Sequence, residues 1–408
     1  MKDDRFEVRC RRVEGAPLVS MRLWIRGGSR TERVPGLSWV TGHMLVEGTR
    51  RRDWSQIAEN GDDLGLVLSS FGGLECHGLR IDCLTRDWIE ALRWLFELAF
   101  ESVFAEDRCR WICQLAQAEL ESLADQPEVR AGWAFAEQLY HPHPAARPIQ
   151  GDADSLASLT SEQCVAFHEA GLASGAVLSV AGEIDEDEVG RAIEAALDGR
   201  RTAKGEESPV PEPRGSGRSR HRVETDSPEQ AHLLMGHLTV PITHPDYREL
   251  EVLSVILGAG SGLTGRIPSR IREREGLAYS SWAAAVAAAG LDPGRLTVAV
   301  GTSPSTIGRA EQAVVEELER LVAEGVEESE VDDARSYLLG REAFRRETAR
   351  QCAELEAQAT FYRVPLDRSE WLAEKLEGLD AERINALARL HVRPNELLTT
   401  VAIPGSQT

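Results

Sequence analysis

The sequence predicts an α+β protein of two homologous domains, each a mainly antiparallel sheet with helices packed on one face. Two observations lead to this fold class. Strand-like stretches come in closely spaced pairs and are followed by long helical stretches. The same order of segments then recurs in the second half of the chain, with a period far too long for a solenoid, which indicates an old duplication.

In the first half, four strand-like stretches precede the first long helix. Residues of strand character occupy 6–13, 18–25, 66–71 and 79–84. The stretch 87–99 instead carries apolar residues at helical spacing, at Ile89, Leu92 and Leu95, and Phe100 follows directly after it. We therefore expect two strand pairs with helices packed against them.

The second half repeats segments of the first at a constant offset. The motif L-T-S-E-Q-C from Leu159 is echoed by L-D-A-E-R-I from Leu379. The strand-like A-V-L-S-V-A from Ala176 is echoed, at the same distance along the chain, by E-L-L-T-T-V from Glu396. Equivalent helices should begin in both halves with an N-cap, for which the sequence offers Thr160 and Asp380.

A stretch rich in Pro, Gly, Ser and charge, 204–222, shows no apolar periodicity and is predicted to be a linker. The predicted domains are accordingly 1–203 and 223–408. Four closely spaced arginines in the linker could form an anion-binding patch, but a solvated connector explains them more simply. They are Arg214, Arg218, Arg220 and Arg222.

Charge and composition exclude some classes of function. The chain has 46 basic and 67 acidic residues, a formal net charge of −21, which argues against nucleic-acid binding and favours basic ligands. Seven scattered cysteines without a C-x-x-C pair argue against a secreted disulfide framework. The N-terminus has no apolar signal region and no run of 18 apolar residues occurs, so we expect a cytoplasmic protein without a membrane partner.

Residues 36–49, G-L-S-W-V-T-G-H-M-L-V-E-G-T, frame the place where a zinc-peptidase motif H-x-x-E-H would lie. Only its last histidine, His43, is present. Trp39 stands at the first ligand position and Gly42 at the catalytic glutamate. An indole offers no lone pair to a metal, and glycine cannot accept a proton from water. The motif therefore predicts a peptidase-like helix without metal binding or water activation.

A third metal ligand would have to come from elsewhere, and the helical stretch 109–125 offers Glu119 and Glu121. His43 with one carboxylate gives fewer than the three protein ligands that a catalytic zinc needs. The favoured interpretation is that His43 is an ordinary helix histidine with a local hydrogen bond. We expect the protein to hold no stoichiometric zinc.

This motif resembles that of the pitrilysin and insulinase family, in particular its two-domain half-size subunits, which include the mitochondrial processing peptidase and bacterial relatives. The family's G-L-A-H-F-L-E-H-M-L-F-K-G-T is matched at Gly36, Leu37, His43, Met44, Leu45, Gly48 and Thr49. The spacing from the motif to the family's distal glutamate ligand leads from His43 to Glu119. The resemblance covers nearly the whole chain and implies a processing-peptidase-like fold.

The second half keeps a different part of the family pattern. The run I-R-E-R-E-G-L-A-Y-S matches the family's I-R-E-K-R-G-L-A-Y-S. In this match Arg272 and Tyr279 correspond to the family's Arg and Tyr pair, which closes over the zinc site from the other domain or subunit. Such donors can stabilise charge on a substrate carbonyl. The alternative is that Tyr279 packs at a strand start while Arg272 caps a helix or pairs with Glu273 or Glu275.

The resemblance also implies two substrate-binding segments. In non-catalytic subunits of the family a Gly-rich loop takes up substrate, and here that loop contains Gly260 and Gly262. Family members also carry an exposed edge strand that adds the peptide as a further strand through main-chain hydrogen bonds. The matching residues are Leu66, Val67, Leu68, Ser69 and Ser70.

Together these features predict a non-catalytic subunit of a heterodimeric zinc metalloendopeptidase. It would hold no cofactor itself, and a partner subunit carrying H-x-x-E-H would supply zinc and the glutamate base. Arg272, Tyr279 and part of the wall for an extended peptide substrate would come from this chain. The alternative is a catalytically dead homodimeric peptide-binding or scaffold protein.

Overall fold

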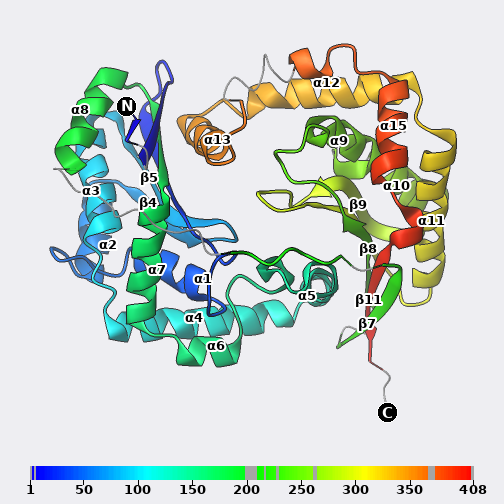
Figure 1. The fold of residues 1–408 in the computed structure, drawn as a ribbon, viewed down its shortest axis with the longest axis horizontal. Coiled ribbons are helices and arrows are strands. Elements are labelled where there is room, and N and C mark those ends of the chain that lie inside the picture. Colours follow the sequence, from blue (N-terminus) through cyan, green and yellow to red (C-terminus); the bar gives the residue numbers. More distant parts are fainter. Residues whose placement is uncertain are drawn as a thin grey trace. The chain divides into compact units, whose positions relative to one another are not determined.

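The computed structural model describes residues 2–3, 6–197, 209–215, 217–226, 229–260, 264–365 and 373–405. The chain forms two compact units, each made of three separate segments (Figure 1). Unit 1 comprises Met1–Glu121, Arg147–Pro211 and Phe344–Leu366, and unit 2 comprises Ser122–Ala146, Glu212–Ala343 and Asp367–Thr408. The compact units are thus discontinuous in sequence, and the domain boundaries at 203 and 223 stay a prediction about the sequence repeat.

Unit 1 is built on a six-stranded sheet with the order β1-β2-β6-β3-β5-β4. All neighbouring strands are antiparallel except β2 and β6. The four strands predicted in this half are all present, with ends that differ by at most a few residues. The strands are β1 Lys2–Asp3, β2 Phe6–Arg12, β3 Leu18–Arg26, β4 Val67–Gly72, β5 Cys76–Leu84 and β6 Ala176–Gly182.

Unit 2 is built on a five-stranded sheet with the order β7-β11-β8-β10-β9, in which only β7 and β11 are parallel. If β1 is set aside, the strands of both sheets follow the same order along the chain: first, fifth, second, fourth, third. This confirms two homologous α+β domains. The strands are β7 Ser219–Thr225, β8 Ala231–Leu238, β9 Ala278–Ala287, β10 Arg295–Thr302 and β11 Leu398–Pro404.

The helices follow the strands as predicted, and the predicted helix 87–99 is α3. Those of the N-terminal half are α1 Leu37–Met44, α2 Trp54–Asp63, α3 Trp88–Phe100, α4 Glu106–Ala124, α5 Pro127–Tyr140, α6 Ala153–Ser158, α7 Ser161–Ser174 and α8 Glu186–Leu197. Those of the C-terminal half are α9 Tyr247–Ser254, α10 Arg266–Pro268, α11 Ile307–Glu324, α12 Glu328–Phe344, α13 Ala349–Phe361 and α15 Ala381–His391. Two π-helical turns, η3 Val255–Ala259 and η4 Ser269–Arg274, flank α10.

In each unit a helix from a distant part of the chain covers the second face of the sheet. In unit 1, Leu23 of β3 joins the core with α1 and α3, whereas its neighbour Trp24 points the other way and meets Phe361 of α13, ring centroids 5.5 Å apart. In unit 2, Phe135 of α5 packs with Leu398 of β11. The predicted helices on one face are therefore joined by one further helix on the opposite face.

Both predicted N-caps are confirmed. The side chain of Thr160 accepts a hydrogen bond from the backbone N–H of Gln163, and Asp380 accepts one from that of Arg383. Strand β7 begins at Ser219, within the predicted linker, so the last residues of that linker belong to the sheet and are not a free connector. An edge strand with alternating exposure needs no continuous apolar run, which is why the pattern missed it. Residues 204–208 and 216 lie outside the described residues.

All seven cysteines are free, and six of them are buried. Within the ranges given above, no helix combines the length and the apolar character needed to cross a bilayer. The cytoplasmic location stays a prediction.

Candidate functional site

The positions of the altered zinc motif lie on α1, where two of them form a stacked pair. Trp39 is buried, and its ring stacks on that of His43 with centroids 3.8 Å apart. His43 Nδ1 lies 2.8 Å from the carbonyl oxygen of Trp39, so this nitrogen carries the hydrogen and donates it. Burial lowers the pKa of His43 below its ordinary value. His43 is thus a locally bonded helix histidine, as the sequence interpretation favoured.

Gly42 has no room for a side chain. A Cβ at this position would overlap the carbonyl oxygen of Phe71 on β4. A Cβ on Gly72, the last residue of β4, would in turn overlap the Cα of Trp39. Helix and strand therefore approach each other backbone to backbone, and the position of the catalytic glutamate is closed by packing as well as by residue type.

Glu119 lies near enough to His43 for its charge to raise the histidine's pKa, against the larger effect of burial. Its carboxylate accepts a hydrogen bond from Gln150 Nε2 at 3.0 Å. Among the residues that the structure describes, no group of three or more His, Cys, Asp or Glu side chains is arranged to hold a metal ion. One imidazole and one carboxylate do not fit a catalytic zinc, and no step of chemistry can be assigned to such an ion in this chain.

The N-terminus of α1 is held by a residue that the sequence patterns did not single out. The carboxylate of Glu32 accepts hydrogen bonds from the backbone N–H groups of Gly36, at 3.1 Å, and Ser38, at 2.9 Å. It is buried, and desolvation raises its pKa to about 7. Glu32 precedes the helix by a loop rather than standing at its N-cap, so no capping pattern could reveal it.

The predicted peptide-binding edge exists in unit 1. Strand β4 pairs with β5 and has no strand on its other side within the described residues, which confirms that it is an edge strand. Val67 is 59% exposed, and Ser69 is also exposed, whereas Leu68 and Ser70 are half-buried. Leu66 is buried and precedes the strand. Whether a peptide adds to this edge stays a prediction.

Arg272 and Tyr279 lie in unit 2 and are both exposed. Arg272 belongs to η4 and Tyr279, 94% exposed, to the start of β9. Within the described part of the chain, neither side chain has a hydrogen bond or an ion pair. The alternative of a packed Tyr279 is therefore wrong. Glu275, offered above as a partner for Arg272, is instead paired with Arg270 and Arg309.

A β-bulge presents Tyr279 to solvent. Strand β9 pairs with β10 so that Ser280 lies opposite Gly301 and Ala278 opposite Thr302, which leaves Tyr279 as an extra residue without a cross-strand partner. Such a bulge bends an edge strand and redirects a side chain. The sequence pattern contains no signal for it, because the bulge depends on the register against β10.

The Gly-rich loop is anchored at both ends by glycines. Gly265 has a positive φ of 111°, and a Cβ there would lie 2.6 Å from the Cα of Gly258. A side chain at Gly260 would meet only ordinary contacts. Gly262 lies outside the described residues. The structure therefore requires glycine at the base of the loop, whereas Gly260 is free to vary on steric grounds.

The site residues thus form two sets. Trp39, Gly42, His43 and Glu119 gather around α1 of unit 1, next to β4. Arg272 and Tyr279 belong to the segment from η4 to β9 of unit 2. The first set cannot perform metal chemistry, and the second offers two unengaged hydrogen-bond donors.

Comparison with known proteins finds one model of the same family in each half of the chain. The model of the insulinase family, peptidase family M16, matches residues 8–153, and that of the peptidase M16 inactive domain matches residues 158–338. An uncharacterised zinc protease of Bacillus subtilis is 25% identical over 375 residues, covering 91% of this chain and 90% of the relative. One of Rickettsia felis is 30% identical over 268 residues, covering 64% and 63%.

A solved structure shows the same fold. The peptidase M16 inactive domain from Pseudomonas fluorescens matches with a TM-score of 0.90 at 22% identity, covering 99% of this chain and 97% of the other. The two family models together span most of the chain, and the motif positions on α1 are altered. The chain therefore belongs to the insulinase family of peptidases, M16, as a member without the intact catalytic motif.

Proposed function

We propose that this chain is the non-catalytic subunit of a heterodimeric zinc metalloendopeptidase. A separate subunit carrying H-x-x-E-H would bring the zinc ion and the general base. The observation that carries the proposal is the contrast between a closed motif helix and an exposed pair of donors: Gly42 has no space for a side chain, whereas Arg272 and Tyr279 are unengaged.

The two donors suit one chemical task. Attack on a peptide carbonyl builds negative charge on its oxygen, and a phenol O–H with a guanidinium can donate hydrogen bonds to substrate carbonyl oxygens. Arg272 and Tyr279 would hold the peptide in register and stabilise that charge at the partner's site. An exposed tyrosine with no internal partner loses no internal hydrogen bond when it engages a substrate.

Peptide binding would use the edge of β4. An extended peptide could add as a seventh strand, through main-chain hydrogen bonds that read no particular sequence. The proposed substrate residues at this edge are Leu66, Val67, Leu68, Ser69 and Ser70, and the proposed second substrate segment contains Gly260 and Gly262. The net charge of −21 favours basic peptides.

The test is reconstitution with an H-x-x-E-H subunit from the same source, followed by a peptide-cleavage assay and elemental analysis. This chain alone should hold no stoichiometric zinc and cleave no peptide, and the pair should be active. Arg272→Ala or Tyr279→Phe should each reduce turnover about 10²-fold to 10³-fold. Arg274→Ala, which removes an exposed arginine from the same turn, is the matched control and should leave turnover unchanged.

Three results would contradict the proposal. Full cleavage by this chain alone, with near-unit zinc lost in Glu119→Ala, would make it a self-sufficient peptidase. Equal losses for Arg272→Ala and Arg274→Ala would remove the special role of Arg272. A homodimer that binds peptides but never raises the activity of an H-x-x-E-H subunit would favour the peptide-binding or scaffold alternative.

A further inference from the structure

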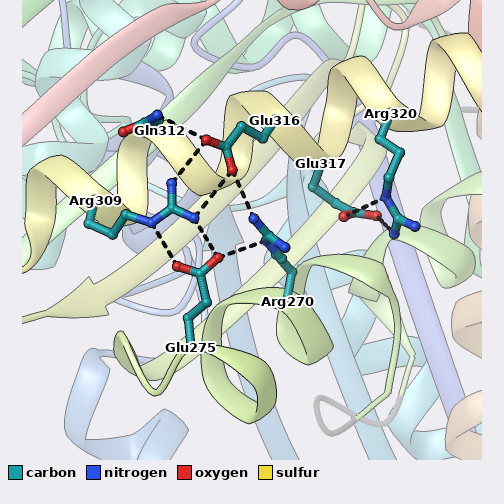
Figure 2. Close-up of polar contacts among 7 residues, drawn as sticks. All are labelled: Arg270, Glu275, Arg309, Gln312, Glu316, Glu317 and Arg320. Atoms are coloured by element: carbon teal, nitrogen blue, oxygen red, sulfur yellow. Dashed lines mark hydrogen bonds and ion pairs between the residues drawn. The ribbon is translucent and has the colours of Figure 1, made fainter.

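Two arginines and two glutamates of unit 2 close a ring of ion pairs between η4 and α11, called here the η4–α11 ring (Figure 2). Arg309 donates to Glu275 through Nε and Nη2, both at 2.7 Å, and to Glu316 through Nη1 at 3.0 Å. Arg270 completes the ring, with Nη2 2.8 Å from Glu316 Oε2 and Nε 2.9 Å from Glu275 Oε1.

The ring differs from an ordinary surface ion pair. Its two positive and two negative charges balance, and each carboxylate faces both guanidinium groups (Figure 2). The four side chains are between 19% and 38% exposed, so solvent screens them only in part. The two parallel hydrogen bonds from Arg309 to Glu275 fix orientation as well as distance, which a single point charge cannot do.

The ring holds η4 through residues that precede and follow Arg272 in the sequence. Arg270 precedes it by two residues and Glu275 follows it by three. Between them Ile271 is fully buried in the core of unit 2, and its carbonyl oxygen accepts a hydrogen bond from Leu277 N–H at 2.8 Å. With its neighbours held in these places, the turn directs Arg272 to solvent.

The same anchoring continues toward Tyr279. Thr302 Oγ1 donates a hydrogen bond to the carbonyl oxygen of Leu277, immediately before the bulge. The segment η4 is π-helical, a form that is rare and occurs mostly as single turns. The ring adds contacts to this turn from α11.

We propose that Arg309, Glu275, Glu316 and Arg270 are positioning residues, which hold η4 and the start of β9 so that Arg272 and Tyr279 keep their exposed, unengaged places. The effect on catalysis rests on the proposed function. The effect on η4 itself concerns the chain alone and can be tested without a partner.

The first experiment compares Arg309→Ala with a matched control in the full-length chain. Arg320 pairs with Glu317 on the same helix, 3.1 Å from Nε to Oε2, and within the described residues no hydrogen bond or ion pair joins either of them to η4 (Figure 2). Amide hydrogen exchange in residues 269–277 should become about tenfold faster in Arg309→Ala and stay unchanged in Arg320→Ala. Unchanged exchange in Arg309→Ala, or equal acceleration in both variants, would overturn the proposal.

The second experiment is a double-mutant cycle in the reconstituted complex. Arg309→Ala should lower kcat about 10²-fold in the wild-type background and have little further effect in a background that carries both Arg272→Ala and Tyr279→Phe, because it acts through these two residues. Arg309→Lys keeps the positive charge without the two parallel hydrogen bonds to Glu275 and should give an intermediate loss of kcat. This variant replaces Arg309→Ala in the cycle if Arg309→Ala fails to fold.

The outcomes separate this inference from the proposed function. A loss from Arg309→Ala that is equal in both backgrounds would make its role merely structural and overturn the positioning claim. If Arg272→Ala leaves activity unchanged, the proposed function fails, while the exchange result still decides whether the ring holds η4.

Discussion

The segments next to edge strands β4 and β9 hold equivalent places in the two repeats, but the side chains are packed in the first and exposed in the second. In unit 1, α1 packs against edge strand β4 and its motif side chains are engaged: Trp39 stacks on His43, and Gly42 meets the backbone of β4. In unit 2, η4 and the start of edge strand β9 leave Arg272 and Tyr279 exposed. The loss of metal chemistry is thus built into the packing of one repeat, while the other repeat retains accessible donors.

The largest expected effect is on the packed region. Trp39→Ala removes a buried indole from the core of unit 1 and should lower the free energy of unfolding by about 3–5 kcal/mol. Trp111→Ala, at a half-exposed position of α4, is the control and should cost roughly 1 kcal/mol or less. Urea unfolding measures both. A loss of stability in Trp39→Ala no larger than the roughly 1 kcal/mol expected of the control would mean that Trp39 is not a structural residue of α1.

The pH dependence of Glu32 should come next. Its folded pKa, about 7, lies above the ordinary value of 4.5, so the folded state binds more protons between these values. Stability of the wild type relative to Glu32→Gln should therefore fall as pH rises through this window, by about 1.4 kcal/mol per pH unit. Urea unfolding at pH 5 and pH 7.5 tests this, and a difference independent of pH would contradict it.

Gly42 and Gly61, both helical glycines, should respond in opposite directions. Gly42→Ala forces a Cβ against Phe71 and should destabilise the protein by roughly 1–3 kcal/mol. Gly61→Ala on α2 meets only an ordinary contact with Trp94, at 4.0 Å, and should stabilise by about 0.5–1 kcal/mol. Thermal unfolding of the two variants provides the measurement. A neutral Gly42→Ala would show that α1 can move away from β4.

The smallest effect is expected where side chains are unengaged. Arg272→Ala and Tyr279→Phe should change the free energy of unfolding by less than about 0.5 kcal/mol, because each removes atoms without internal partners. The midpoint of urea unfolding checks this. A loss above about 1 kcal/mol would place these residues among the structural ones and erase the contrast with Trp39.

The sequence alone predicted much of the fold because its signals are local. Strand character, helical spacing and the N-caps Thr160 and Asp380 act over a few residues and were confirmed. The motif comparison likewise identified Trp39 and Gly42 as substitutions. The missing lone pair and the missing base follow from residue type, so no structure was needed to predict a site without metal chemistry.

The contacts between distant segments follow from the fold and from no local pattern in the sequence. Helix α13 covers a sheet whose strands all come from the first half of the chain, and Glu32 reaches α1 through a loop. The bulge at Tyr279 and the η4–α11 ring likewise depend on register and on contacts across the fold. Such contacts are set by the packing of whole elements, which residue-by-residue propensities cannot encode.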